Sequence, residues 1–257
     1  MPDSANPSLA GRIAVVTGSS SGIGQAIALE LARCGADVIV HGRRSREGAE
    51  QTAEEIGRVG RESRVLMADL AKLAEQDRLA EEAWAWRDGI DIWINCAGVD
   101  LLTGEAPRWT FEQKLETLWR VDVTASLRLA REIGRRMKLQ GRGVILNIGW
   151  DQADHGMAGD SGELFGAAKG AVMAHTKSLA LSLAPEVRIN CLAPGWIRTS
   201  WGENASEAWQ VRAQREAQLG RWGEPIDVAR TARFLVSDEA SFVTGQVWAV
   251  NGGFKES

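Results

Sequence analysis

Short apolar runs alternate with helix-periodic stretches along almost the whole chain. The first apolar run covers residues 13–16, and after it apolar side chains recur at helical spacing over residues 23–34. A short run rich in β-branched residues predicts a buried strand, and the helical spacing predicts a helix with one buried face. The chain therefore begins with a strand, a glycine-rich turn and a helix.

The same alternation continues toward the C-terminus. Further strands are predicted at residues 37–41, 64–68, 90–94, 144–148, 187–192 and 246–250. Helices are predicted at residues 45–59, 73–87, 109–139, 164–184 and 225–236. Strands that alternate with helices in this way predict an α/β fold in a single domain. We expect a doubly wound (Rossmann) parallel sheet of about seven strands with helices on both faces.

Three segments fall outside this alternation. Residues 149–163 are rich in glycine and carboxylates and predict a loop. Residues 200–221 are polar with weak periodicity, which predicts a mobile lid over a substrate site. Residues 1–10 predict a flexible tail, and the first nine of them lack the basic and apolar regions of a signal peptide.

The glycine-rich turn is the first candidate for chemistry. Residues 17–24 read Thr-Gly-Ser-Ser-Ser-Gly-Ile-Gly between the first strand and the first helix. At such a turn the first helical N–H groups and the helix dipole can receive a phosphate, and glycines let the backbone approach it. The spacing differs from the G-x-G-x-x-G fingerprint. The turn predicts a dinucleotide site, with an ordinary glycine-rich loop as the alternative.

The residues at the end of the second predicted strand indicate which dinucleotide the site would bind. Gly42, Arg43 and Arg44 stand where a dinucleotide fold reads the adenosine ribose. A carboxylate there would favour NAD, whereas guanidinium donors suit a 2′-phosphate. NADP(H) is therefore favoured over NAD(H). The alternative is that both arginines are solvated loop charges.

Composition narrows the remaining classes. The 257 residues are 44% apolar and 25% charged with a net charge of −4, which argues against nucleic-acid and membrane partners. No apolar run approaches the roughly 20 residues of a membrane helix. The 3 cysteines lie far apart and the 3 histidines lack ligand spacing, which predicts a reducing, cytoplasmic location and no metal site. There are 11 tryptophans and no tyrosine.

Five ordered motifs resemble those of the short-chain dehydrogenase/reductase family, over nearly the whole chain. The glycine turn is similar to the family's T-G-x-x-x-G-x-G element. The others are Asn95-Cys96-Ala97-Gly98, residues 194–199, residues 223–229 and residues 244–246. The most similar branch contains the 3-oxoacyl-acyl-carrier-protein reductases. The resemblance implies hydride transfer at a carbonyl or hydroxyl group of a small or acyl-type substrate.

The resemblance also implies cofactor contacts by position. Residues expected at the pyrophosphate and ribose are Gly18, Ser20, Ser21, Gly22, Ile23 and Gly24, with Arg43 at the 2′-phosphate. Asp69 and Leu70 would flank adenine, and Asn95, Ala97 and Gly98 would line the cofactor. The nicotinamide end would meet Pro194, Gly195, Ile197 and Thr199, and Lys169 would bond the ribose.

The catalytic positions depart from the family pattern. Family members reduce carbonyls with Asn, Ser, Tyr and Lys, and the Tyr and Lys share a helix face at i and i+4. Here Lys169 is retained, while Phe165 stands at the tyrosine position, Trp150 at the serine position and Asp122 at the asparagine position. We therefore expect the standard activity to be weak or absent, because a positioned general acid contributes about 10²–10⁴ in rate.

Three functional hypotheses follow. The first is an oxidoreductase with a relocated acid, for which His155 is preferred because histidine donates a proton near neutral pH. Other candidates are Asp122, Asp151, Asp154, Asp160 and Glu163, and for each candidate a solvated loop charge is the favoured alternative. The second is a dinucleotide-binding sensor or structural protein without redox activity. The third is non-redox, lyase-type chemistry.

The sequence gives less information about binding partners than about the cofactor. Helix-forming residues 109–139 and 164–184 carry more apolar side chains than one sheet face needs, and family members pair such helices. A homodimer or homotetramer is therefore expected by resemblance, with a thick monomeric core as the alternative. Trp196, Trp201 and Trp209 could line a bulky apolar pocket or could be packing residues. The sequence does not identify the small-molecule substrate.

Overall fold

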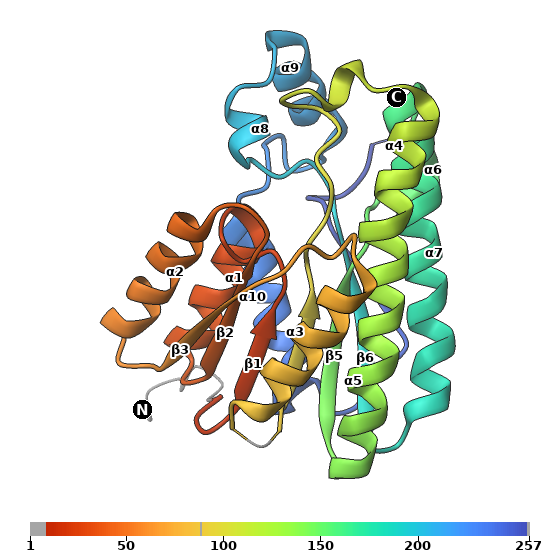
Figure 1. The fold of residues 1–257 in the computed structure, drawn as a ribbon. Coiled ribbons are helices and arrows are strands. Elements are labelled where there is room, and N and C mark those ends of the chain that lie inside the picture. The colour runs from red at the N-terminus through yellow and green to blue at the C-terminus, as the bar shows by residue number, and fades with distance from the viewer. Residues whose placement is uncertain (1–8, 88, 256–257) are drawn as a thin grey trace, which may run out of the picture.

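The computed structural model describes residues 9–87 and 89–255, and most of the predicted tail lies outside them. Its centre is one parallel sheet in the order β3-β2-β1-β4-β5-β6-β7, shown in Figure 1. The strands are β1 (Ile13–Val16), β2 (Asp37–Gly42), β3 (Ser63–Met67), β4 (Ile92–Asn95), β5 (Gly143–Ile148), β6 (Val187–Pro194) and β7 (Val247–Val250). The predicted doubly wound α/β fold is confirmed.

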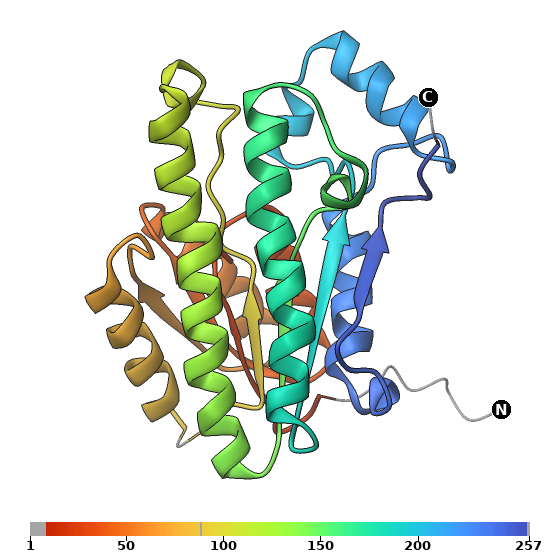
Figure 2. The same ribbon diagram turned by 90° about the vertical axis from the view of Figure 1, so that its right-hand side faces the viewer.

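Helices cover both faces of this sheet (Figures 1 and 2). One face carries α1 (Gly22–Arg33), α2 (Arg46–Arg58) and α10 (Pro225–Val236). The other carries α3 (Leu73–Ala85), α5 (Ser126–Gln140) and α7 (Asp160–Leu183). Successive strand side chains point to opposite faces, so Val16 joins the first layer and Val15 the second. Both are fully buried, which explains why this strand is apolar at every position.

The strand order reverses between β1 and β4, and this places the functional edge of the sheet. β1 pairs with β2 on one side and with β4 on the other. The loops that follow β1 and β4 therefore diverge at the carboxyl ends of these strands and leave a crevice between them. In open α/β sheets ligands bind in this crevice. The glycine turn after β1 and the Asn95–Gly98 loop after β4 both border it.

The helix predicted over residues 109–139 is interrupted. The segment consists of a 3₁₀ turn (Ala106–Arg108), α4 (Phe111–Leu118), a π-helix (Trp119–Ala125) and then α5. A π-helix widens the turn by one residue, and such turns are common at functional sites. Apolar periodicity alone does not distinguish it from the flanking α-helix. It turns Asp122, only 1% exposed, toward the interior.

Two predicted irregular segments contain helices. Residues 149–163 include α6 (Gln152–His155) and the first turn of α7. Residues 200–221 include α8 (Ser200–Glu203) and α9 (Glu207–Glu216), which stand above the carboxyl ends of the strands in Figure 1. Trp201 on α8 and Trp209 on α9 pack against each other and against Trp196, and such aromatic contacts leave little of the aliphatic spacing that marks a helix. A short 3₁₀ turn (Asp238–Ala240) precedes β7. Among the described helices none is long and apolar enough to cross a bilayer.

Candidate dinucleotide and substrate site

The glycine turn is built so that no larger residue fits. Gly18 has a φ of +68°, and a Cβ there would lie 2.7 Å from the Cα of Ala97 on the neighbouring loop. A Cβ on Gly24 would overlap the carbonyl of Gly18. Within the described ranges the Ser21 side chain does not cap α1, so the first helical N–H groups remain available to an anion. These features fit a phosphate cradle.

His41, which the sequence analysis did not single out, supports this turn. It is the penultimate residue of β2, is 2% exposed, and its Nδ1 accepts a hydrogen bond from the Gly18 N–H at 3.0 Å. Its Nε2 lies 3.1 Å from the carbonyl oxygen of Ala68, so Nε2 carries the proton. The Ser19 N–H donates to the His41 carbonyl at 2.9 Å. Burial lowers the pKa of His41 to about 4, so the ring is neutral when it accepts from Gly18.

A cavity of about 370 Å³ follows the turn along the edge of the sheet. Predicted cofactor residues that line it are Gly18, Ser20, Ser21, Ile23, Gly24, Arg43, Leu70, Ala97, Gly98 and Thr199. His41 and Arg44 line it as well. Both arginines are exposed, so their guanidinium groups are free to approach a ligand at this end. The structure therefore brings together most of the predicted residues from five separate loops.

Three predicted cofactor residues line neither this cavity nor a larger one that continues from it. Asn95 accepts from Trp93 Nε1 at 2.8 Å and donates to Asn147 Oδ1 at 2.9 Å, so its amide joins β4 to β5. Asp69 accepts from the Ala71 N–H at 3.1 Å and so stabilises the turn before α3. Pro194 ends β6. Their sequence positions match the motifs, but the first two side chains are engaged in local structure.

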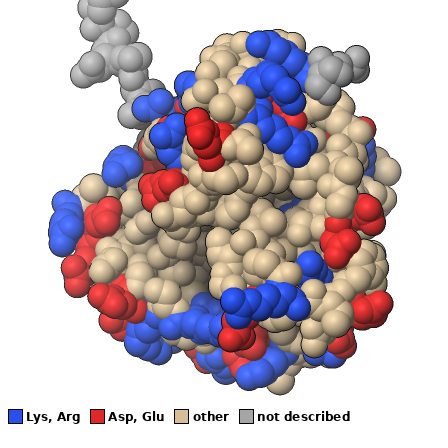
Figure 3. Space-filling model, turned by 90° about the horizontal axis from the view of Figure 1, so that it is seen from above, with Lys and Arg blue, Asp and Glu red and all other residues tan. Residues whose placement is uncertain are grey.

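A second cavity, of about 710 Å³, continues from the first. It includes Gly22, Gly195, Ile197 and Lys169 from the prediction. Most of its remaining wall is aromatic or apolar, formed by Val99, Leu102, Trp150, Met157, Phe165, Trp196, Trp201 and Trp209. Seen from above in Figure 3, the hollow is bordered largely by uncharged residues. This arrangement suits an apolar ligand next to the nucleotide cavity.

Lys169 stands where the two cavities meet, and its charge is paired. Its Nζ lies 2.9 Å from Asp122 Oδ1 and donates to the carbonyl oxygen of Ile148 at 3.3 Å. The other carboxylate oxygen of Asp122 accepts from the Val99 N–H at 2.9 Å. Burial by itself lowers the pKa of Lys169, but the adjacent Asp122 carboxylate outweighs it and the net pKa is raised. Lys169 is therefore a firmly held ammonium and a poor proton donor at neutral pH.

Phe165 and Trp150 occupy the space in front of this ammonium. Phe165 lies one helical turn before Lys169 on α7, and both line the larger cavity. The ring of Trp150 contacts Phe165 edge-on, with 6.0 Å between the ring centroids. Neither Phe165 nor the carbon edge of an indole donates a proton. The chemistry here is that of an apolar wall beside one cation–carboxylate pair.

His155, the preferred candidate for a relocated acid, lies outside the lining of the larger cavity. His155 is exposed, and its ring stacks on Phe254 with 4.2 Å between centroids and an interplanar angle of 4°. It is not part of the lining of the larger cavity. The reason is that α6 turns the loop toward the C-terminal segment, which the sequence pattern did not reveal. Asp154 and Glu163 are also exposed and outside this lining.

Asp151 is buried behind the cavity wall. It is 4% exposed, and its Oδ2 accepts from Asn251 Nδ2 at 3.1 Å. Burial raises the pKa of Asp151. Asp160 does line the cavity, and it forms an ion pair with Lys114 at 3.7 Å. Of the acids considered from the sequence, Asp160 lines the larger cavity, and Asp122 is paired with Lys169, which also lines it.

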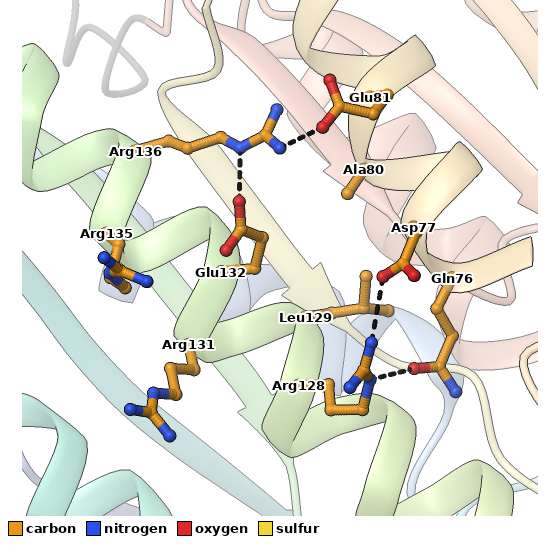
Figure 4. A pocket seen from close by; sticks show the side chains of 10 residues that line it. All are labelled: Gln76, Asp77, Ala80, Glu81, Arg128, Leu129, Arg131, Glu132, Arg135 and Arg136. Atoms are coloured by element: carbon orange, nitrogen blue, oxygen red, sulfur yellow. Dashed lines mark hydrogen bonds and ion pairs between the residues drawn. The ribbon is translucent and has the colours of Figure 1, made fainter. Parts of the chain in front are cut away.

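A further hollow between α3 and α5 has the character of an ion-pair network (Figure 4). Arg128 binds Asp77 at 3.0 Å, and Arg136 bridges Glu132 and Glu81. In the figure these two arginines point toward α3, while Arg131 and Arg135 extend away from it. The charges inside the hollow satisfy one another, so it carries no separate chemistry.

A glycine turn at the switch point of a parallel sheet, with an apolar cavity beyond it, defines a dinucleotide-binding protein of the doubly wound class. The family model described as enoyl-(acyl carrier protein) reductase matches residues 18–255. A 3-oxoacyl-acyl-carrier-protein reductase of Aquifex aeolicus is 36% identical over 95% of this chain and 98% of its own. The chain belongs to the short-chain dehydrogenase/reductase family of NAD(P)-dependent oxidoreductases.

Solved structures agree with this assignment. A gluconate 5-dehydrogenase of Burkholderia cenocepacia, in complex with NADP and tartrate, has a TM-score of 0.85 and 29% identity, covering 95% of each chain. A short-chain type dehydrogenase/reductase of Mycobacterium ulcerans has a TM-score of 0.86 and 30% identity, covering 96% of this chain and 90% of its own.

Proposed function

We propose that this protein binds NADP(H) in the crevice and reduces ordinary ketones weakly or not at all. The glycine turn and the first turn of α1 would hold the pyrophosphate, and Arg43 and Arg44 would hold the 2′-phosphate. Lys169 would bond the nicotinamide ribose. When bound, the dinucleotide supplies or accepts a hydride at its pyridine ring. The NADP complex of the Burkholderia relative supports the choice of cofactor.

The observation that carries the second half of the proposal is the pairing around Lys169. Reduction of a ketone leaves an alkoxide, which must be protonated as it forms. The family's tyrosine would stand at Phe165, and Asp122 neutralises the ammonium that would otherwise assist it. Losing the acid alone should cost about 10²–10⁴ in rate.

Other side chains of the larger cavity do not replace that acid. Asp100 accepts from the N–H groups of Leu102 and Thr103 at 2.7 and 3.1 Å, so it organises its own loop. Packing around the Cys96 thiol raises its pKa to about 12. Asp160 is exposed and paired with Lys114. None of these three described side chains is placed to serve as the general acid.

A dinucleotide-binding protein without redox activity is the alternative function. The Lys169–Asp122 pair favours it, because a held ammonium can bond a ribose without taking part in proton transfer.

Measurements of binding and turnover test the proposal. NADPH and NADH are titrated by nicotinamide fluorescence, and NADPH oxidation is then followed with a panel of ketones and with acetoacetyl-coenzyme A. We expect NADPH to bind at least tenfold more tightly than NADH, and Arg43→Ala to reduce that preference. Rapid turnover of the simple ketones would contradict the proposal, as would equal binding of the two dinucleotides.

We also propose that the chain forms a homodimer or homotetramer. Phe111, Leu115 and Trp119 lie four residues apart along α4 and the π-helix and are 39%, 37% and 44% exposed. An exposed apolar row of this kind is typical of an interaction surface. Light scattering at micromolar concentration tests this, and a monomer would contradict it. A cytoplasmic location without nucleic-acid or membrane partners stays a prediction from composition.

A further inference from the structure

Aromatic rings form a continuous surface on the larger cavity, which we call the tryptophan wall: Trp150, Phe165, Trp196, Trp201 and Trp209. Trp196 connects its parts, with centroid distances of 6.5 Å to Trp150, 6.0 Å to Trp201 and 5.1 Å to Trp209. All five members are partly exposed, and all five line the cavity. The wall extends from the position beside Lys169 to α8 and α9.

Hydrogen bonds and ring contacts hold the wall in place. Trp196 Nε1 donates to Glu216 Oε2 at 2.7 Å, and the other oxygen of that carboxylate accepts from Arg212 Nε at 2.7 Å. The Arg212 guanidinium lies 4.8 Å from the centroid of Trp209. Trp222, 1% exposed, packs against Trp201 with 5.8 Å between centroids. Rings fixed in this way present a preformed surface, which reduces the entropy lost on binding a rigid ligand.

The chemistry of this surface selects a type of ring. The faces of indole rings are electron-rich, and offset or edge-on contacts with another ring contribute about 0.5–1.5 kcal/mol beyond burial. A ring that carries carbonyl groups is electron-poor and therefore stacks well on such faces. A saturated ring of equal size gains only the burial.

We propose that the ligand of this cavity is a flat, fused-ring quinone. The inference rests on the proposed function, because it explains how an intact nucleotide site can serve a cavity without a proton donor. A hydride from bound NADPH would reduce the quinone by two electrons. The C–H bond of the dihydronicotinamide would break, and one O–H bond would form on the quinone. The remaining oxygen becomes a phenolate, with a pKa of about 10 as in tyrosine, and takes its proton from water. No positioned acid is required, unlike for a ketone.

Binding tests the ligand class independently of turnover. Dimethylnaphthoquinone, whose blocked ring edge does not react with thiols, is compared with decalone, a saturated fused-ring ketone of similar size. Equilibrium dialysis is run without dinucleotide and again with saturating NADP⁺. We expect the quinone to bind at least tenfold more tightly than decalone in both conditions. Equal affinities would overturn the proposal, as would displacement of the quinone by NADP⁺.

Variants locate the site. Trp209→Leu should weaken quinone binding about tenfold, Trp209→Phe should retain most of it, and Trp248→Leu on β7 should leave it unchanged. Circular dichroism confirms that each variant is folded. Unchanged binding in Trp209→Leu would contradict the proposal. Because the first dialysis contains no dinucleotide, failure of NADPH binding would count against the proposed function without altering this result.

Discussion

The two cavities of the crevice differ in how far their side chains follow the family pattern. The nucleotide cavity keeps the glycine turn and adds Arg43 and Arg44 at its far end. The larger cavity is lined by Trp150 and Phe165, at two positions where the family resemblance predicts hydroxyl groups. The phosphate cradle depends on backbone N–H groups and on the absence of Cβ atoms, whereas the proton transfer depends on single side chains. One cavity can therefore change its chemistry while the other is preserved.

Lys169 lines the larger cavity, and its ammonium donates to the carbonyl oxygen of Ile148, which lines the nucleotide cavity. A buried ammonium without a partner is strongly unfavourable, so Lys169 needs a counter-charge nearby. Asp122 supplies it at 2.9 Å. The π-helix makes this possible, because it turns Asp122 inward between α4 and α5.

The largest expected effect concerns the glycine turn, where a substitution should impair ligand binding in the nucleotide cavity and not in the larger cavity. Gly18→Val requires a β-branched residue at a φ of +68° and a Cβ 2.7 Å from the Ala97 Cα. We expect NADPH binding to weaken at least 1,000-fold, about 4 kcal/mol, with quinone binding retained. Gly57→Val on α2, where a Cβ meets nothing within 4 Å, is the control. Retained NADPH affinity in Gly18→Val, measured by fluorescence titration, would show that the turn is not the cradle.

The next largest effect is a pH-dependent loss of stability that is linked to His41, the residue that supports the glycine turn. His41 has a pKa of about 4 when folded, below the ordinary 6.5, so the unfolded chain takes up its proton first as pH falls. The stability linked to neutral His41 is complete above pH 6.5 and is lost as pH falls to 4, by about 3 kcal/mol.

Urea unfolding at pH 7 and pH 4.5 measures this loss. His41→Gln should show a smaller loss of unfolding free energy between the two pH values than the wild type. His155→Gln, which replaces an exposed ring, is the matched control. Identical pH dependence in His41→Gln and the wild type would refute the assignment.

A smaller effect restores chemistry to the larger cavity. Phe165→Tyr places a phenol one turn before Lys169, and we expect the rate of NADPH-dependent ketone reduction to rise at least tenfold. Trp150 still fills the serine position, so the gain should be well below the full value of a positioned acid. Phe165→Leu controls for altered packing and should not gain activity. A Phe165→Tyr variant as slow as the wild type would argue that Asp122 also has to be replaced.

The smallest expected effect is at the loop behind the wall. Burial raises the pKa of Asp151, so its charged form destabilises the folded state at neutral pH. Asp151→Asn removes that charge and can still accept from Asn251, so we expect stability to rise by up to about 1 kcal/mol. Thermal unfolding at pH 7 measures it, with Asp154→Asn as an exposed control. A marked fall in the melting temperature would mean that the carboxylate makes a required contact.

The sequence determined the fold class, because alternating apolar runs and helical periodicity are local patterns set by side-chain burial. It also located the glycine turn and the arginines, since each lies within one short segment. The structure decided what distant segments do to one another: His41 beneath Gly18, Asp122 against Lys169, and a wall of rings drawn from five segments of the chain. Such contacts depend on register and on a π-helical turn, and neither leaves a periodic signal in the chain.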